Sequence, residues 1–248
     1  MICEDLLKGG ISVPYSNLKI AIIPARGGSK RIPRKNIKNF CGKPILAYSI
    51  EAAKSSHLFD EVMVSTDDKE ITEIAQKYGA SVPFFRSKTT AGDYATTTDV
   101  LLEVLGNYQK QGRMFSLLCY VYPTAPFVTA KRLKQAYQLL EDSKADALLP
   151  VVPFSYPLLR GLTIQENRLR MKWPENTFVR SQDLEPVYHD SGQFCFLRTE
   201  ALLRERNIFC QNMVPMVLSD LEVQDIDNET DWELAELKYE LLKRKGML

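Results

Sequence analysis

The 248-residue sequence lacks several features, and each absence removes a class of protein. Its five cysteines stand singly, with no Cys-x-x-Cys pair, so the chain has no zinc-ribbon pattern and fits a reducing cytoplasm better than a disulfide framework. No apolar run approaches the roughly 18 residues that span a membrane, and no signal peptide is recognisable, so we expect no membrane partner. The formal net charge of +1 excludes the broad basic face of a general nucleic-acid-binding protein, and we expect no nucleic-acid partner.

Two common nucleotide-binding patterns are also missing. No segment matches the Walker A pattern G-x-x-x-x-G-K-[ST], and residues 26–31, R-G-G-S-K-R, do not match G-x-G-x-x-G. These absences disfavour a P-loop NTPase and a dinucleotide-dependent dehydrogenase. The composition is otherwise ordinary for a globular domain, with 45% hydrophobic and 25% charged residues.

The most informative stretch that is present runs from Ile20 to Ile37. Residues 20–23 form an apolar run with the length of a buried strand, too short for a helix. The following loop contains Gly27 and Gly28, where a missing Cβ lets backbone N–H groups approach a ligand closely. Six of the thirteen residues from 26 to 38 are basic: Arg26, Lys30, Arg31, Arg34, Lys35 and Lys38. A strand that leads into such a loop predicts a polyphosphate site, and the alternative is a solvated basic loop.

Strand-like and helix-like segments alternate along the chain. The expected strands are residues 20–23, 61–65, 82–85, 115–122, 145–152 and 192–198, followed by a strand-like V-P-M-V-L segment. The expected helices are residues 44–56, 69–78, 96–110 and 130–141, and a last helix that begins near residue 228. Asp67 or Asp68 can cap the second of these helices. Such alternation predicts an α/β fold of three layers, with a Rossmann-like, mostly parallel sheet covered on both faces.

The alternation stops at Pro153 and resumes after residue 186. Within this part Leu169, Met171 and Trp173 alternate with basic residues, which indicates one strand of a hairpin with a half-buried face. We expect residues 153–186 to form an inserted dimerisation arm, and the alternative is a surface hairpin folded on its own domain. The expected organisation is one domain over residues 18–248, preceded by an extension over residues 1–17.

A pair of carboxylates occurs about 200 residues after the basic loop, in the segment Asp225-Ile226-Asp227. Alternation along an extended segment places both carboxylates on one side and turns Ile226 inward. Two carboxylates facing a cationic phosphate loop can hold Mg²⁺ against phosphate oxygens, with water supplying further ligands. The alternative is a turn followed by the N-cap of the last helix, and the basic loop favours the metal site.

The segments together resemble a known family. The stretch I-I-P-A-R-G-G-S-K-R-I-P-R-K-N-I, the P-T-A-P turn and the D-I-D segment are similar to those of the CMP-sialic acid synthetases, cytidylyltransferases that activate nonulosonic acids. The resemblance extends from Lys19 to the C-terminus and implies a fold of the nucleotide-diphospho-sugar transferase type. The segments R-S-Q-D-L, Y-H-D-S-G-Q-F and Y-P-T-A-P-F resemble most the branch that activates pseudaminic acid. N-acetylneuraminate enzymes typically have Gln where this chain has Tyr122.

The resemblance implies a reaction and its partners. CTP and a nine-carbon 2-keto sugar acid would give a CMP-sugar and pyrophosphate, with Mg²⁺ as cofactor. The homodimer is expected from the inserted arm, because a hairpin of this kind cannot bury its apolar side alone. The anomeric hydroxyl would attack the α-phosphorus in line, so catalysis would consist mainly of positioning and charge neutralisation. N-acetylneuraminic, legionaminic and Kdo acids are the alternative sugars. A related transferase using a hexose 1-phosphate, or a non-catalytic nucleotide-binding module, are alternative functions.

The resemblance also assigns roles to individual positions. The nucleotide-binding residues would be Arg26, Gly27, Gly28, Ser29, Lys30, Lys35, Asn36, Arg86 and Thr96. The sugar-binding residues would be Thr97, Tyr122, Arg180, Tyr188, His189 and Gln193. The metal ligands would be Asp225 and Asp227, and the catalytic residues Lys30, Lys35 and Asp227. Arg180 is suited to a bidentate grip on the sugar carboxylate. For His189, a structural role is the alternative.

Overall fold

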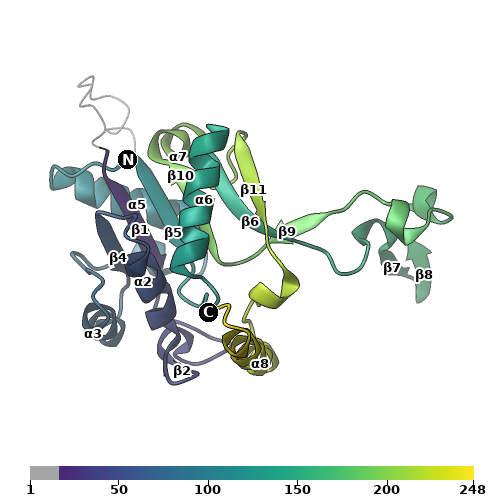
Figure 1. Ribbon diagram of the computed structural model, residues 1–248, viewed down its shortest axis with the longest axis horizontal. Helices are drawn as coiled ribbons and strands as arrows, with labels where there is room; N and C mark the ends of the chain where they lie inside the picture. Colours follow the sequence, from purple (N-terminus) through teal and green to yellow (C-terminus); the bar gives the residue numbers. More distant parts are fainter. Residues whose placement is uncertain (1–16) are drawn as a thin grey trace.

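The computed structural model describes residues 17–248, so the predicted extension over residues 1–17 lies outside the described residues apart from Asn17. Its centre is a seven-stranded sheet in which six strands follow the order β11-β6-β10-β5-β1-β4, and β9 pairs with β6 (Figure 1). The strands are β1 (Lys19–Pro24), β4 (Glu61–Ser65), β5 (Leu117–Val121), β6 (Ala147–Pro153), β9 (Tyr188–Asp190), β10 (Phe194–Arg198) and β11 (Met213–Val217). β1 is parallel to β4 and β5, and β11 is parallel to β6. The predicted mostly parallel sheet is therefore confirmed.

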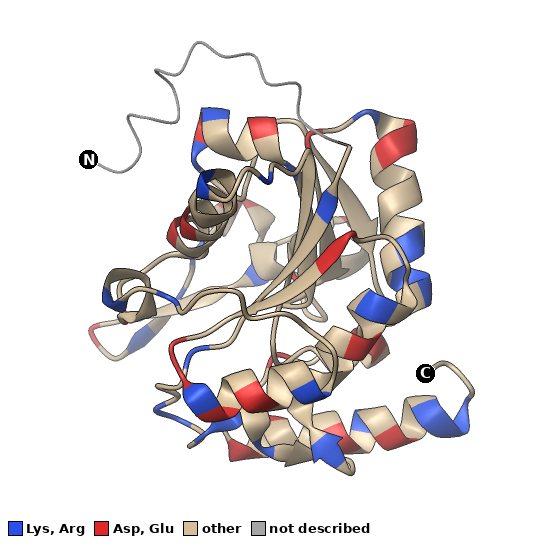
Figure 2. Ribbon diagram, turned by 90° about the vertical axis from the view of Figure 1, so that its left-hand side faces the viewer, with Lys and Arg blue, Asp and Glu red and all other residues tan. Residues whose placement is uncertain are grey.

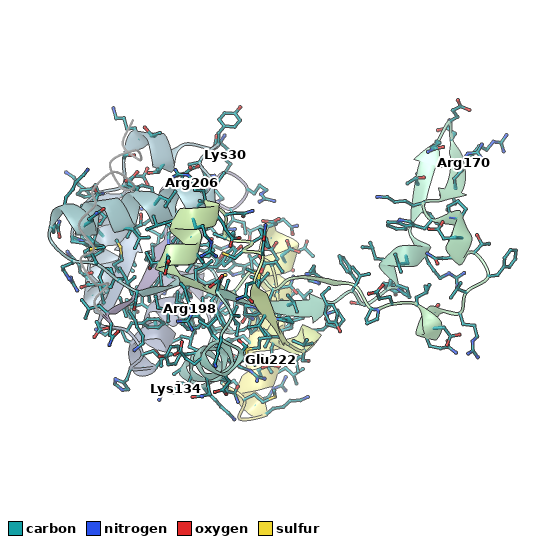
Figure 3. All side chains as sticks on the ribbon, turned by 90° about the horizontal axis from the view of Figure 1, so that it is seen from above. Lys30, Lys134, Arg170, Arg198, Arg206 and Glu222 are labelled. Atoms are coloured by element: carbon teal, nitrogen blue, oxygen red, sulfur yellow. The ribbon has the colours of Figure 1, made fainter. Side chains whose placement is uncertain are left out.

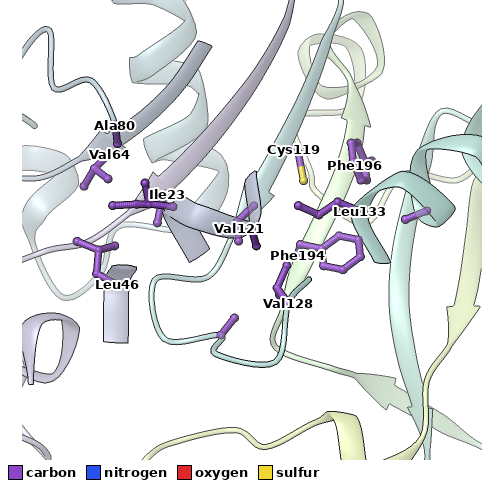
Figure 4. Packing of buried hydrophobic residues seen from close by; sticks show 14 of the residues in the cluster. Ile23, Leu46, Val64, Ala80, Cys119, Val121, Val128, Leu133, Phe194 and Phe196 are labelled. Atoms are coloured by element: carbon purple, nitrogen blue, oxygen red, sulfur yellow. The ribbon is translucent and has the colours of Figure 1, made fainter. Parts of the chain in front are cut away.

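Helices cover both faces of the sheet. They are α2 (Ile45–Ser55), α3 (Lys69–Lys77), α4 (Lys88–Ala91), α5 (Thr97–Lys110), α6 (Ala130–Ser143), α7 (Thr199–Glu205) and α8 (Glu229–Arg244). Successive residues of β1 point to opposite faces, so Ile23 packs in the cluster that includes α2, α3 and α6, whereas Ile22 packs in the cluster that includes α5 and α7. Figure 4 shows the first cluster around Ile23, Val121 and Phe194. Burial on both faces explains why these strands have nearly continuous apolar runs.

Two features of the sheet differ from the simple alternation. Residues 82–85 were expected to be a strand, and this prediction is wrong: only Ser81 forms an isolated bridge, to Met63 of β4. Pro83 has no N–H group, so the segment cannot continue the ladder of hydrogen bonds. β10 lies between β5 and β6 and is antiparallel to both. The amino end of β10 therefore lies at the edge where β5 and β6 end.

The segment after β6 leaves the domain as a projecting arm. Its outer part is the antiparallel hairpin of β7 (Leu162–Gln165) and β8 (Arg168–Met171), flanked by the 3-10 turns η2 (Leu158–Arg160), η3 (Pro174–Asn176) and η4 (Ser181–Asp183). Figures 1 and 3 show this hairpin well separated from the sheet, with Arg170 far from Lys30 of the domain. The alternative of a hairpin folded on its own domain is therefore wrong.

The last helix joins the basic loop in a third apolar cluster. Asn228 caps α8 in a capping box with Asp231, and the basic residues of its last turn lie near the C-terminus (Figure 2). Ile32 from the loop and Ile226 from the D-I-D segment are each 1% exposed in this cluster, together with Trp232 of α8. The β2 (Asn39–Phe40) and β3 (Lys43–Pro44) turn contributes Phe40 to the same cluster. Further members come from α2, from α8 and from the loop after β5. The cluster thus fixes the D-I-D segment beside the basic loop.

Candidate active site

The candidate site is assembled at the edge of the sheet where β1, β4 and β5 end. The basic loop follows β1, the segment T-D-D follows β4, and Tyr122 follows β5. Because these strands are parallel, their following loops meet at one edge, which is the usual binding edge of open α/β sheets. The strand β10 starts at the same edge, and the 3-10 turn η1 (Lys35–Ile37) closes the basic loop.

Arg26 and Lys30, two predicted nucleotide-binding residues, share one acidic partner. Arg26 Nη1 lies 2.9 Å from Asp93 Oδ1, and Lys30 Nζ lies 2.5 Å from Asp93 Oδ2. Arg26 is also held through its backbone, because Asn36 Nδ2 donates to its carbonyl oxygen at 2.9 Å. Asn36 is 5% exposed, so the geometry gives it a structural contact within the loop, and its predicted contact with the nucleotide stays a prediction.

The two aspartates after β4 contact the basic loop at two places, Asp67 at Gly27 and Asp68 at Arg34. The N–H of Gly27 donates to Asp67 Oδ1 at 3.0 Å. Arg34 forms two hydrogen bonds to Asp68, and the Ile71 N–H donates to Asp68 Oδ1 at 3.0 Å as the N-cap contact of α3. These hydrogen bonds, chiefly the one from Arg34, lower the pKa of Asp68 to about 2. Asp68 therefore connects the basic loop to the start of α3.

Lys35 connects the loop to the predicted metal pair. Its ammonium group donates to the carbonyl oxygen of Ile226 at 2.7 Å, between Asp225 and Asp227. Burial lowers the pKa of Lys35, while the charges of Asp227 and Asp225 act in the opposite direction. Arg31 adds a second connection, because its Nη2 lies 2.7 Å from Asp227 Oδ1. The sequence prediction that Ile226 turns inward is confirmed, and the two carboxylates face the cationic loop.

The residues present fit the predicted Mg²⁺. Burial away from water raises the pKa of Asp225, and the negative charge of Asp227 raises it further. The two carboxylates therefore repel each other, and a divalent cation between them would relieve this repulsion. Two carboxylates supplemented by water and phosphate oxygens are a usual Mg²⁺ environment. Residues 17–248 contain no group of three or more His, Cys, Asp or Glu side chains arranged for a metal, so a ligand set of two carboxylates is what the described chain offers.

Arg86 and the threonines at the start of α5 have well-defined contacts. Arg86 is 8% exposed and donates to the carbonyl oxygen and hydroxyl of Ser65 at the end of β4, and burial lowers its pKa. Thr96 is the N-cap of α5 in a capping box with Asp99. Thr97 begins the helix. Arg86 therefore lies at the edge of the sheet where β4 ends, whereas the hydroxyl of Thr96 is engaged in capping α5.

A polar network surrounds Tyr122, the predicted sugar-contacting residue. Its N–H donates to the Gln193 carbonyl at 2.8 Å, and its own carbonyl accepts from the Ser49 hydroxyl at 2.7 Å. The Tyr122 hydroxyl donates to Asp190 Oδ2 at 3.3 Å, and the Tyr120 ring lies 4.7 Å away. Burial raises the pKa of both tyrosines, that of Tyr120 to about 12, so both hydroxyls stay protonated near neutral pH.

Gln193 links the start of β10 to the chain just before the Asp225–Asp227 pair. It is 4% exposed, and its side-chain amide donates to the carbonyl oxygen of Glu222, three residues before Asp225. Gly192 precedes it with φ +64°, and a Cβ at Gly192 would lie 4.0 Å from Asp225 Oδ1. The segment between β9 and β10 therefore lies beside the carboxylate pair.

The remaining residues that the sequence predicts to bind the sugar lie on or near the arm. Tyr188 and His189 form β9 at its base, where Tyr188 pairs with Pro153 and the His189 ring lies 4.9 Å from the Phe154 ring. Arg180 belongs to the arm itself and forms a bidentate ion pair with Asp183. Figure 1 shows the hairpin of β7 and β8 separated from the sheet. The side-chain hydrogen bonds of Arg180 go to Asp183 of the same arm, so in the part of the chain that the structure describes Arg180 does not contact the other predicted site residues.

Sequence reasoning missed several acidic partners of the site. Asp93, Asp67 and Asp190 contact predicted site residues, and Arg31 contacts Asp227. The sequence carries a partial signal for Asp67, which lies two residues after the predicted strand 61–65 at the binding edge. Asp93 stands in an irregular segment, where no periodicity indicates the direction of a side chain, and Asp190 ends the short strand β9, which the sequence did not predict.

Known proteins are similar to this chain over most of its length. The sequence profile of the cytidylyltransferase family matches residues 20–243. The pseudaminic acid cytidylyltransferase of Campylobacter jejuni is 43% identical over 223 residues, which cover 90% of this chain and 96% of the relative. The CMP-N,N'-diacetyllegionaminic acid synthase of Legionella pneumophila is 32% identical over 225 residues, with coverage of 90% and 96%.

A solved structure shares the fold. The CMP:2-keto-3-deoxy-manno-octonic acid synthetase in complex with CTP superposes with a TM-score of 0.63 at 16% identity, covering 92% of this chain and 99% of that one. At this identity the likeness concerns the fold.

Proposed function

Because the chain belongs to the cytidylyltransferase family and is a nucleotidyltransferase, we propose that it transfers CMP from CTP to the anomeric hydroxyl of pseudaminic acid, releasing pyrophosphate. The predicted family resemblance is thereby confirmed. The observation that carries the proposal is the hydrogen bond of 2.7 Å from Lys35 to the carbonyl oxygen of Ile226. It joins the polyphosphate loop to the carboxylate pair, and nucleotidyl transfer needs both parts.

The basic loop would hold the triphosphate by charge. Arg26 and Lys30 point their cationic groups at a common acceptor, which is the arrangement that adjacent phosphate oxygens require. Lys35, fixed against the Ile226 carbonyl, would neutralise charge that develops at the α-phosphate as the bond to pyrophosphate breaks. The loop would also hold the nucleotide still for in-line attack, and no covalent enzyme intermediate is needed.

Mg²⁺ is the proposed cofactor. Asp225 and Asp227 would hold it, and the bound ion would neutralise charge on phosphate oxygens. The ion pair between Arg31 and Asp227 is the contact that metal binding at Asp227 would have to rearrange.

Pseudaminic acid is the proposed sugar. The proposal is supported by a relative named for that sugar at 43% identity, against 32% for one named for diacetyllegionaminic acid, at equal coverage of this chain. The sugar would lie between Tyr122 and the segment of Tyr188, His189 and Gln193. Pyrophosphate release with CTP and a panel of pseudaminic, legionaminic, N-acetylneuraminic and Kdo acids tests this. A higher kcat/KM for any acid other than pseudaminic acid would refute the sugar assignment.

A homodimer built through the arm is the proposed assembly. The arm exposes large apolar side chains, including Ile164 at 75%, Leu169 at 69% and Phe178 at 97% exposure. Covering such side chains with a partner subunit removes apolar surface from water and therefore favours association. A swapped arm would also bring Arg180 to a sugar site that its own chain does not reach. Sedimentation of the wild type and of an Ile164→Glu, Leu169→Glu double variant tests the assembly: a dimer in both, or a monomer in both, would contradict it.

Arg180 has its own test. Arg180→Ala should raise the KM for the sugar acid far more than the KM for CTP, because the lost contact is to the sugar carboxylate. Equal changes in both KM values would remove Arg180 from the sugar site.

The cytoplasm is the proposed compartment. Among the described residues, four cysteines are free, as a reducing compartment would keep them. No helix within residues 17–248 has the length and apolar character needed to cross a membrane.

A further inference from the structure

Asp93 is the feature of the site that the reaction as proposed does not explain. Its two carboxylate oxygens each accept a hydrogen bond from a different cation of the basic loop, from Arg26 Nη1 at 2.9 Å and from Lys30 Nζ at 2.5 Å. Asp93 is 67 positions from Arg26 and 63 positions from Lys30 in sequence, so these contacts are made by the fold and not by local chain geometry. A negatively charged group with two acceptor oxygens between two cations has the same recognition chemistry as a phosphate.

The segment that carries Asp93 is fixed at both ends. On one side, Glu103 of α5 accepts from the Ser87 N–H at 2.8 Å, from the Ser87 hydroxyl at 2.6 Å and from the Thr90 hydroxyl at 2.5 Å. On the other side, the capping box of Thr96 and Asp99 fixes the start of α5. Only residues 91–95 lie between Thr90 and Thr96. Asp93 is therefore presented to the loop by a short, tethered segment and remains near it when its contacts break.

Asp93 is also exposed, so another anion can replace it at Arg26 and Lys30. Its side chain is 47% exposed, and those of Arg26 and Lys30 are 36% and 76% exposed, so water and ions reach all three. The hydrogen bond from Lys30, followed by that from Arg26, lowers the pKa of Asp93, so the group stays charged at neutral pH. Exposed ion pairs of this kind are weak and reversible.

We propose that Asp93 is an internal competitor for polyphosphate: its carboxylate contends with pyrophosphate for Arg26 and Lys30 and thereby limits the affinity of the loop for that product. The inference rests on the proposed function, in which the loop holds the triphosphate and pyrophosphate is released. A loop with unopposed cations would bind pyrophosphate more tightly and release it more slowly. Asp93 takes back the two cations as pyrophosphate leaves, so it favours turnover at the expense of binding.

The test compares pyrophosphate binding by calorimetry, at fixed ionic strength with Mg²⁺, in the wild type, Asp93→Asn and Asp146→Asn. Asp146 is a matched control, because its carboxylate is paired with Arg204 at the start of β6, on the opposite edge of the sheet. Asp93→Asn should bind pyrophosphate about two- to tenfold more tightly, a range that corresponds to losing competition from exposed ion pairs. Asp146→Asn should bind like the wild type, which separates the effect from a change in net charge.

Two further measurements complete the test. In a Lys30→Ala background the gain from Asp93→Asn should shrink, because one of the two contested cations is gone. In turnover, Asp93→Asn should be inhibited by lower concentrations of added pyrophosphate. Equal or weaker pyrophosphate binding by Asp93→Asn, while the wild type binds it and Lys30→Ala binds it less, would overturn the inference alone. If the wild type and Lys30→Ala bind pyrophosphate equally, the loop is not the polyphosphate site, and the proposed function fails together with the inference.

Discussion

Replacing Gly27 by alanine should disturb the protein through Asp68, while the same change at Gly28 should not. A Cβ built at Gly27 would lie 2.8 Å from Asp68 Oδ2 and 3.1 Å from Asp68 Cβ, whereas a Cβ at Gly28 has no atom within 4 Å. A contact of 2.8 Å is too short, so Asp68 must move. Its carboxylate cannot move freely, because it caps α3 and binds Arg34.

The magnitude follows from what Asp68 would lose. Loss of an N-cap contact costs about 0.5–2 kcal/mol. The ion pair with Arg34 adds at most about 1 kcal/mol, because the Arg34 side chain is 39% exposed and solvent screens the pair. We therefore expect Gly27→Ala to lower the free energy of unfolding by about 0.5–3 kcal/mol. Gly28→Ala should leave it unchanged or raise it slightly, because alanine restricts the unfolded chain.

The two variants also separate an effect on the stability of the protein from an effect on CTP binding. Urea unfolding gives the stability, and initial rates at varied CTP give the KM. Gly28→Ala should keep its stability but raise the KM for CTP, because the sequence argument requires close approach of the loop backbone to phosphate. Gly27→Ala should show both a loss of stability and a higher KM. Equal stability of the two variants would refute the steric argument, and an unchanged KM in Gly28→Ala would refute close approach at that position.

Three other predictions concern the same edge of the sheet. Asp227→Asn should abolish turnover at every Mg²⁺ concentration and leave CTP binding, measured by calorimetry, largely intact; normal turnover would contradict its metal role. Ile226→Ala should lower the free energy of unfolding by about 2–4 kcal/mol and also impair turnover at high CTP, whereas Ile50→Ala, equally buried in another cluster, should cost similar stability without the second effect. Asp68 has a folded-state pKa of about 2 against an ordinary 3.8, so its carboxylate stabilises the fold above pH 3.8 and loses this effect as the pH falls toward 2. The difference in urea midpoint between the wild type and Asp68→Asn should therefore be constant from pH 8 to about 5 and shrink below about 4; a difference that grows with acidification would contradict the assigned pKa.

The elements of the central sheet could be predicted because burial on both faces leaves a continuous apolar run. The strands at residues 20–23 and 61–65 and the amphipathic helix capped by Asp68 are confirmed. The apolar run of β10 indicated a strand but not its direction, since a strand buried on both faces carries the same pattern whether parallel or antiparallel. The segment 82–85 carries apolar residues of the right kind, and Pro83 removed the donor that a ladder needs.

The site was predictable where a chemical type identifies a ligand and unpredictable where only the fold creates the contact. Basic side chains and glycines after a first strand indicated phosphate, and the spacing of Asp225 and Asp227 indicated a shared face. The contact of Asp93 with Arg26 joins two irregular segments, and neither segment carries a signal for the other. The role of Arg180 stays a prediction, because its surroundings within one chain are those of the arm.

The pairing of Pro153 with Tyr188 closes the base of the arm where it joins the sheet, and we call this pair the seam. The chain leaves β6 and returns through β9 as neighbours in one antiparallel ladder, and it then re-enters the sheet through β10 beside β6. Residues 154–187 are therefore closed at their base like the stem of a hairpin, and the order of the sheet does not depend on their length. An arm of another length or sequence could be grafted at this seam without a change in the strands that carry the phosphate loop. The segment from Tyr188 to Gln193 begins where the arm returns to the sheet, so the arm and the basic loop could change independently in sequence, and the residues predicted to bind the sugar lie between them.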